Sequence, residues 1–379
     1  MNALDVGLVV LGLIVLVGGG ELLVRGASSL ASSWGLSPLV IGLTVVAMGT
    51  SAPELAVSVE AVFRNEADLA IGNVVGSNIA NVLLILGIAA LILPLAVKQQ
   101  LVRIDVPVMI GASVALLIFA ADGIISLVDG LLLLALVLVH TAVTLILGRR
   151  ETIALRKGAI NDQSATEAVD APTAHRPTFV VSVLFVLGGI GLLVVGANLL
   201  ITGAVNIAAS LGVGSLVIGL TVVAVGTSLP ELVTSVIAAV RGQRDIAVGN
   251  IVGSCIANIG FVLGVPALIS GGGILVAPAA VALDIPLMLA AAVVIAPLTF
   301  TGFTVQRWEG VMLVGLYLAY MTYVVLDATA HDAQSGFTWT MVLFVLPLLV
   351  LTVATTVFYD VRRRSNRRKS GQISPVKLT

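Results

Sequence analysis

The sequence predicts an all-α polytopic membrane protein with two inverted five-helix repeats, broken helices 2 and 7, and an extra C-terminal eleventh transmembrane helix. Three observations carry this prediction. The 379 residues are 59% hydrophobic and 10% charged, whereas soluble domains usually carry about 25% charged residues. A polar motif occurs twice inside apolar segments, and basic residues concentrate in alternate loops. The sequence gives no indication of nucleic-acid binding, and a single cysteine, Cys255, excludes an intrachain disulfide.

Eleven stretches are long and apolar enough to span a bilayer, which requires about 20 residues each. Two of them are interrupted near Pro53 and Pro230, because proline lacks an N–H and crowds the carbonyl four residues earlier. The first stretch has no basic leader or small-residue cleavage site, so we expect it to be retained. The stretches cover approximately residues 4–23, 36–63, 67–95, 101–121, 124–147, 178–200, 215–240, 246–269, 277–300, 310–326 and 339–358.

An internal repeat relates the two halves of the chain at a constant offset of 177 residues. Thr50 corresponds to Thr227 and Glu54 to Glu231, and the offset continues through the next span. The repeat predicts four regions in chain order. They are a first membrane repeat at 1–147, a polar cytoplasmic linker at 148–177, a second membrane repeat at 178–327, and an extra span with a basic tail at 328–379.

The distribution of basic residues predicts the orientation of the chain. An offset of five spans inverts the second repeat relative to the first. With the N-terminus outside, 18 of the 19 Lys and Arg residues fall at cytoplasmic span ends, and only Arg64 falls outside. Positively charged loops favour the cytoplasm. We therefore expect a multi-pass protein of the plasma membrane with the N-terminus outside and the C-terminus in the cytoplasm.

The repeated motifs concentrate oxygen donors within the predicted spans. Thr50 and Glu54 are one helical turn apart, as are Ser77 and Asn81, so each pair can share a helix face. Broken helices in inverted repeats are typical of alternating-access transporters. Oxygen donors suit hard cations such as Na⁺ and Ca²⁺. The pseudo-two-fold axis would bring Glu54 and Glu231 together, where they would repel each other without a proton or cation between them.

The pairs GTSAPE with GNVVGSNIAN and GTSLPE with GNIVGSCIAN resemble the two α-repeats of the cation/calcium exchanger superfamily, in particular prokaryotic sodium/calcium exchangers. The resemblance implies ten core helices around clustered cation sites. It implies that Glu54 and Glu231 bind Ca²⁺ together with the main-chain carbonyls of Thr50 and Thr227. The resemblance also implies sodium and central-cluster ligands at Ser51, Ser77, Ser228, Ser254, the Thr227 hydroxyl, the carbonyls of Ala47 and Ala224, and the amides of Asn81 and Asn258.

Two features depart from that family pattern. Many sodium/calcium exchangers have an aspartate at the position of Asn258, so this pocket contains only two evident carboxylates. Because of this substitution, the ion stoichiometry, pH dependence and calcium selectivity of the family do not carry over directly to this chain. The eleventh predicted span lies outside the ten-helix core of the family.

The sequence favours a secondary antiporter in which Na⁺ entry drives Ca²⁺ out of the cell. Exchange of Ca²⁺ or another cation against H⁺ is the alternative of the same fold. A cation channel would use the same oxygens, but an internal inverted repeat favours a transporter. An intramembrane protease would require an activated nucleophile, and the serines here lack a neighbouring base, so we expect no enzyme. We expect no cofactor, and we expect a monomer in the lipid bilayer.

Several polar residues outside the ion motifs have structural interpretations. We expect Asn73 and Asn250 to make contacts between helices. Asp105 precedes a proline near the start of a span, which suggests a role at a helix N-terminus. His140 has no partner at a ligand spacing along the sequence.

Overall fold

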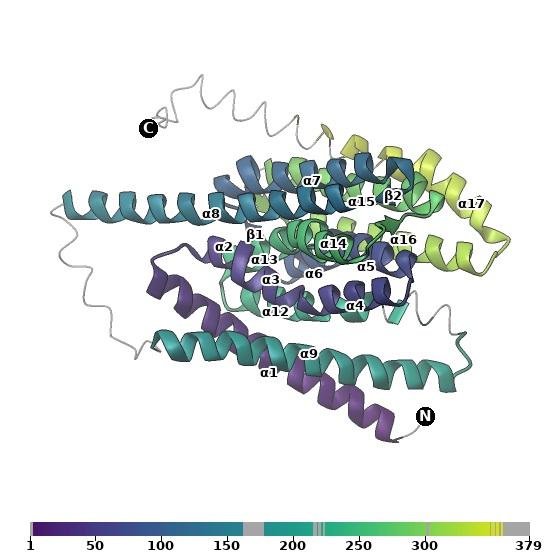
Figure 1. Cartoon of the computed structure of the whole chain (residues 1–379), viewed down its shortest axis with the longest axis horizontal. Coiled ribbons are helices and arrows are strands. Elements are labelled where there is room, and N and C mark those ends of the chain that lie inside the picture. The colour runs from purple at the N-terminus through teal and green to yellow at the C-terminus, as the bar shows by residue number, and fades with distance from the viewer. Residues whose placement is uncertain are drawn as a thin grey trace.

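The computed structural model describes residues 3–161, 178–214, 218, 221–222, 224–300, 303–348, 350–352, 354–355 and 358 (Figure 1). Among these residues, nine helices are long and apolar enough to cross a membrane, and a bent pair makes ten. The remaining predicted span, 215–240, lies partly outside the described residues. The all-helical membrane fold is therefore confirmed.

The first repeat contains long helices joined by short π-helical segments and two short strands. Its helices and strands are α1 (Ala3–Trp34), α2 (Pro38–Ile41), α3 (Ala47–Thr50), α4 (Ala52–Phe63), α5 (Ala67–Ile79), α6 (Leu86–Ile92), β1 (Leu95–Ala96), α7 (Val106–Phe119), β2 (Ile124–Ile125) and α8 (Leu127–Asn161). The π-helical segments are Gly42–Val46, Ala80–Ile85 and Leu101–Asp105, and Ala120–Asp122 is a 3₁₀ turn.

The second repeat has the same order of elements. Its helices and strands are α9 (Phe179–Ser210), α11 (Ala224–Thr227), α12 (Leu229–Val240), α13 (Arg244–Ala257), α14 (Gly264–Ile269), β3 (Ile274–Leu275), α15 (Ile285–Phe300), β4 (Thr304–Val305) and α16 (Arg307–Ala328). Its π-helical segments are Asn258–Val262 and Ala280–Asp284. Helix α17 (Ala333–Thr340) and the π-helical segment Met341–Val345 follow, so helical structure begins before the predicted start of the extra span at residue 339.

Two small antiparallel sheets join the repeats at opposite ends of the molecule (Figure 1). In one sheet Leu95 of β1 pairs with Val305 of β4, and in the other Ile124 of β2 pairs with Leu275 of β3. Each repeat thus contributes one strand to each end. An inverted repeat requires this arrangement, because inversion places equivalent strands of the two repeats on opposite sides of the membrane.

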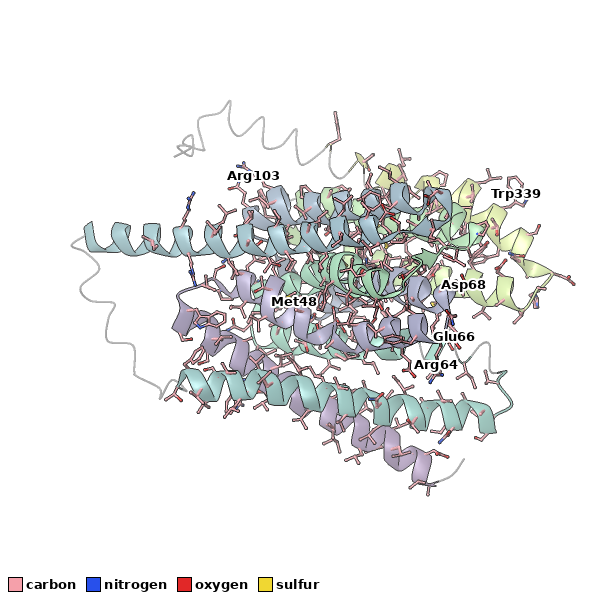
Figure 2. The ribbon with its side chains drawn as sticks, in the orientation of Figure 1. Met48, Arg64, Glu66, Asp68, Arg103 and Trp339 are labelled. Atoms are coloured by element: carbon pink, nitrogen blue, oxygen red, sulfur yellow. The ribbon has the colours of Figure 1, made fainter. Side chains whose placement is uncertain are left out.

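A charged contact and the positions of two loops agree with the predicted sides of the membrane on which the span ends lie. Lys98 Nζ lies 2.9 Å from Asp245 Oδ2, which joins the loop after α6 to the start of α13. Figure 2 places Arg103 at one end of the bundle, and Arg64 and Asp68 at the other. The distribution of basic residues predicts that these loops lie on opposite sides of the membrane, and the structure separates them in the same way.

The centre of the bundle consists of the equivalent helices α5 and α13 with the π-helical segments that follow them. Both are buried along most of their length, as shown by Val74 and Ile251, which are fully enclosed. Helices α1 and α9 pack side by side along one flank (Figure 1). The ion motifs therefore lie at the most enclosed level of the fold.

Glycines spaced seven residues apart allow α1 and α9 to pack closely. They are Gly12, Gly19 and Gly26 in α1, and Gly189, Gly196 and Gly203 in α9. A Cβ atom at Gly19 would lie 2.8 Å from the Leu193 nitrogen, and one at Gly196 would lie 2.7 Å from the Leu16 nitrogen. Small residues at such crossings let two helix backbones approach each other in a membrane. The repeat offset of 177 residues preserves all three positions.

Substitution of alanine for Gly19 should destabilise the α1–α9 contact by about 1–3 kcal/mol, because the added methyl overpacks the interface. Gly18 is the matched control, since a Cβ there meets no atom within 4 Å. Gly18→Ala should be neutral or stabilise the helix by up to about 1 kcal/mol. Melting temperatures of the purified variants compare the two. Equal effects at both glycines would contradict the packing explanation.

Helix α8 extends beyond its predicted membrane end near residue 147, because it continues to Asn161. The first half of the predicted linker is thus helical, and residues 162–177 lie outside the described part of the chain. The basic tail from residue 359 also lies outside it. Trp339 lies in α17 at the same end of the bundle as Arg64 (Figure 2).

Candidate cation-binding site

Two helix breaks at equivalent positions form the framework of the site. Ser51 separates α3 from α4 with φ −81° and ψ 5°, and Ser228 separates α11 from α12 with φ −87° and ψ 7°. The two parts of the first broken helix are bent by 42°. Pro53 and Pro230 lie in the first turn after each break, where a missing N–H is tolerated. The predicted breaks in helices 2 and 7 are therefore confirmed.

The two glutamates of the motifs are buried just after these breaks. Glu54 is 1% exposed and Glu231 is 0% exposed. Ser51 Oγ donates a hydrogen bond to Glu231 Oε1 at 3.3 Å, so the first motif directly contacts the second glutamate. Among the described residues, both oxygens of Glu54 and Oε2 of Glu231 have no hydrogen-bond partner. Buried carboxylates without partners are strongly destabilising unless a proton or cation compensates them.

Hydroxyl and amide groups from both repeats meet beside the carboxylates. Thr50 Oγ1 donates to Asn250 Oδ1 at 3.1 Å and lies 3.5 Å from Ser254 Oγ. The carbonyl of Ala47 accepts from Thr50 Oγ1 at 3.3 Å and from the Ser51 nitrogen at 3.0 Å. The structure thus brings the predicted residues of α3 next to those of α13, which come from opposite halves of the sequence.

Asn73 and Asn250 hold the backbone of the two glutamates in place. Asn73 Nδ2 donates to the Glu54 carbonyl at 3.0 Å and to Ser58 Oγ at 2.9 Å. Asn250 Nδ2 makes the equivalent bonds to the Glu231 carbonyl at 3.5 Å and to Ser235 Oγ at 3.0 Å. The predicted role of both asparagines in contacts between helices is confirmed.

The two serines in these contacts, Ser58 and Ser235, are not among the residues predicted from the sequence. They are themselves 177 residues apart, so the repeat offset could have identified them. Each lies one turn after a motif glutamate and is fully buried.

The predicted amide ligands lie at π-helical segments of the two central helices. Asn81 lies in the segment Ala80–Ile85, and Asn258 begins the segment Asn258–Val262. Such segments are frequent at functional sites because they redirect side chains. Both residues are at most 1% exposed. Among the described residues, neither amide atom of Asn81 has a hydrogen-bond partner, nor has Oδ1 of Asn258.

The remaining predicted ligands follow the same symmetry. Ser77 is buried in α5, and the hydroxyl of Ser228 is buried at the second break with no hydrogen-bond partner in the described part of the chain. Ala224 and Thr227 lie in α11, the counterpart of α3. No group of three or more His, Cys, Asp or Glu side chains that could hold a metal occurs among the described residues. The site therefore offers many neutral oxygens and two carboxylates, a set that suits Na⁺ or Ca²⁺ as transported substrates.

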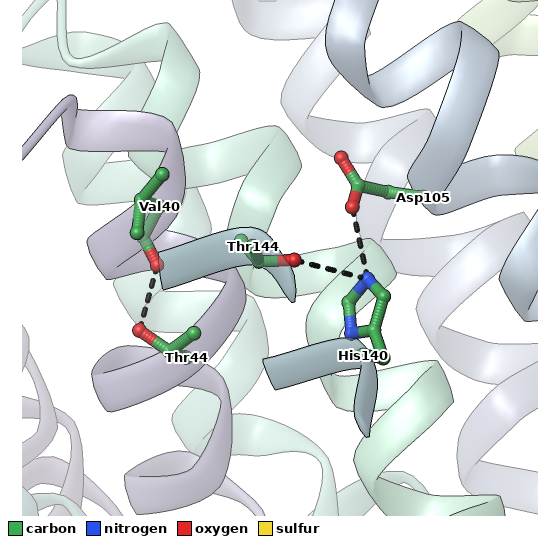
Figure 3. A network of polar contacts seen from close by, with 5 residues as sticks. All are labelled: Val40, Thr44, Asp105, His140 and Thr144. Atoms are coloured by element: carbon green, nitrogen blue, oxygen red, sulfur yellow. Dashed lines mark hydrogen bonds and ion pairs between the residues drawn. The ribbon is translucent and has the colours of Figure 1, made fainter. Parts of the chain in front are cut away.

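A second buried polar contact lies outside the ion motifs (Figure 3). His140 Nε2 of α8 lies 2.9 Å from Asp105 Oδ1, and Thr144 Oγ1 lies 3.4 Å from the same nitrogen. His140 has no partner at a ligand spacing along the sequence, and the fold supplies a distant one, because it brings together residues 35 positions apart. Asp105 precedes α7 but makes no side-chain cap there. Its role is to join the fourth and fifth spans.

Comparisons with known proteins agree with this geometry. A family model described as sodium/calcium exchanger protein matches residues 4–146 and 181–326. The chain is 37% identical over 315 residues to the putative antiporter CaxA of Alkalimonas amylolytica, covering 82% of this chain and 96% of that protein. It is 33% identical over 345 residues to the sodium/calcium exchanger MaX1 of Methanosarcina acetivorans, covering 83% and 96% respectively.

A solved structure has the same fold. The sodium–calcium exchanger NCX_Mj, soaked with 2.5 mM Na⁺ and 0.1 mM Ca²⁺, matches with a TM-score of 0.71 and 31% sequence identity. The match covers 85% of this chain and 99% of that protein. The matched share of that protein is almost complete, so the similarity extends through both repeats.

Proposed function

Because this chain belongs to the sodium/calcium exchanger protein family, whose members are secondary transporters and not enzymes, we propose that it exchanges Na⁺ for Ca²⁺ across the membrane by alternating access. Na⁺ entry drives Ca²⁺ out of the cell. The relatives named as sodium/calcium exchangers support this choice of ions. The chain acts as a monomer, since one chain supplies both halves of the site.

The buried glutamate pair is the observation that carries this proposal. One carboxylate comes from each repeat, three of their four oxygens have no hydrogen-bond partner among the described residues, and Ser51 joins the two motifs. Glu54 and Glu231 bind Ca²⁺ with the carbonyls of Thr50 and Thr227. The sodium ligands are Ser51, Ser77, Ser228, Ser254, the Thr227 hydroxyl and the carbonyls of Ala47 and Ala224, and Asn81 and Asn258 complete the cluster.

Charge balance explains why the two ion movements are coupled. One Ca²⁺ or two Na⁺ neutralise the two carboxylates, so the loaded site can pass between its two orientations. The empty site would hold two bare carboxylates at membrane depth, where an uncompensated charge costs several kcal/mol. The empty site therefore changes slowly between its two orientations. It returns to the first side of the membrane only after it has bound the counter-ion.

The proposed orientation has the N-terminus outside the cell and the C-terminus in the cytoplasm of a plasma membrane. Its support is the concentration of Lys and Arg at one set of span ends. Arg103 lies at the proposed cytoplasmic end of the bundle, and Glu66 and Asp68 lie at the proposed outer end (Figure 2).

Calcium uptake into Na⁺-loaded proteoliposomes tests the counter-ion. We expect uptake to require an outward Na⁺ gradient, to stop when a sodium ionophore collapses that gradient, and to continue with a protonophore. Uptake that stops only with the protonophore would replace the proposal by exchange against H⁺. Ca²⁺ flux that ignores both gradients would contradict coupled exchange and would support a channel.

A further inference from the structure

The side-chain amide of Asn78 has a fixed orientation in the centre of the fold. Its Nδ2 donates to the carbonyl of Cys255 at 3.3 Å and to Met288 Sδ at 3.4 Å. A carbonyl oxygen and a thioether sulfur can accept hydrogen bonds but cannot donate them. The nitrogen of Asn78 must therefore face these two groups, and its Oδ1 must face the opposite way.

Asn78 in turn orients the amide of Asn258. Asn258 Nδ2 donates to Asn78 Oδ1 at 3.1 Å. The reversed amide would bring two carbonyl oxygens together, so the acceptor on Asn78 holds the nitrogen of Asn258 on that side. The other atom, Asn258 Oδ1, is buried and has no hydrogen-bond partner in the described part of the chain.

The free oxygen of Asn258 belongs to the same helix face as the ion motif. Asn258 follows Ser254 by four residues, which is about one turn. Ser254 Oγ lies 3.5 Å from Thr50 Oγ1 of the opposite repeat. In the observed orientation Asn258 Oδ1 lies on the side of the amide that faces away from Asn78, and in the reversed orientation two N–H groups would take that side.

We propose that Asn78 is a positioning residue for cation binding, which acts through Asn258 and does not itself touch the ion. Its Oδ1 holds the Asn258 amide so that a neutral oxygen faces the glutamates. This inference rests on the proposed function, because it assumes that the glutamate pair binds the transported cation. It assigns a role in cation affinity to a residue that is not among the predicted ligands.

A double-mutant cycle on the full-length purified protein tests the proposal, with Ca²⁺ binding measured by calorimetry and melting temperature measured in parallel. Asn78→Leu removes the acceptor and keeps the branched shape of the side chain, and we expect the Kd for Ca²⁺ to rise about tenfold, as for other partners that orient a metal ligand. Asn258→Ala should raise the Kd by a similar factor. In the Asn258→Ala background, Asn78→Leu should add less than about twofold, because its only route to the ion is then gone.

Met288→Leu is the matched control, since it removes one partner of Asn78 Nδ2 but leaves the Cys255 carbonyl and the bond to Asn258. Its Kd should equal that of the wild type. A tenfold rise from Asn78→Leu in the Asn258→Ala background, or an unchanged Kd in the single variant, would overturn the proposal. If Asn78→Leu does not fold, Asn78→Ala enters the same cycle with the same criteria. Failure of the proposed function is distinct, because Ca²⁺ binding to the wild type would then be unaffected by Na⁺.

Discussion

Glu54→Gln should lower Na⁺-driven Ca²⁺ uptake by about 100-fold or more. The substitution keeps the size of the side chain but removes one of the two charges that compensate the divalent cation. Breaking a buried charge interaction costs about 3–5 kcal/mol, and each 1.4 kcal/mol is a factor of ten in affinity. Initial rates in proteoliposomes, normalised to the amount of reconstituted protein, provide the measurement. Glu231→Gln should have an equivalent effect, because the two residues hold equivalent positions in the repeat.

Glu60 provides a matched control in the same helix. Its side chain is 62% exposed and pairs with Arg64, so Glu60→Gln should change uptake by less than about twofold. Similar losses for Glu54→Gln and Glu60→Gln would indicate a general effect of charge in α4. Nearly normal uptake in Glu54→Gln would exclude this carboxylate as a calcium ligand.

Substitution of leucine for His140 should destabilise the folded protein by about 3–5 kcal/mol, since it leaves the buried Asp105 carboxylate without its partner. The Asp105 side chain is fully enclosed, and its other oxygen has no hydrogen-bond partner in the described region. The loss should appear as a lower melting temperature, or as a lower denaturant midpoint in detergent. Ca²⁺ affinity at a temperature where the variant is folded should remain close to that of the wild type.

A double variant separates the buried pair from general packing. Asp105→Asn combined with His140→Leu should be more stable than His140→Leu alone, because it removes the unpaired charge as well. Val139→Ala is the control for a truncation beside His140, since Val139 is 62% exposed. If the double variant is less stable than both single variants, the contribution of His140 lies in its packing and not in its contact with Asp105.

The repeat and the two broken helices could be predicted from sequence because their signals are local and occur twice. The sequence Thr-Ser-x-Pro-Glu fixes the break by the chemistry of proline, and the constant offset identifies the symmetry. Hydropathy was sufficient for the spans, since a bilayer requires long apolar helices. The inverted repeat predicts that Glu54 and Glu231 come together, and the contact between Ser51 and Glu231 agrees with this, although no local pattern specifies which atoms touch.

Contacts between distant segments could not be predicted in the same way. Asp105 and His140 lie in two apolar spans with no shared motif, and only the packing of α8 on the preceding span joins them. Asn78 aligns with Cys255 in the repeat, so a comparison of the two halves does not identify this position as polar in both. Its polar role depends on the contact between these two symmetry-related positions in the fold. A short helix in the linker was possible but could not be assigned from sequence, because the mixed-charge residues up to Asn161 lack the apolar pattern on which the spans were assigned.

The central claim is that Ca²⁺ and Na⁺ compete for one site built from both repeats. Equilibrium Ca²⁺ binding to the purified protein, titrated at several Na⁺ concentrations with K⁺ holding the ionic strength constant, tests it most directly. We expect Na⁺ to raise the apparent Kd for Ca²⁺ more steeply than linearly, at an unchanged number of calcium sites, because at least two Na⁺ replace one Ca²⁺. A Kd for Ca²⁺ that stays constant as Na⁺ rises would contradict the claim.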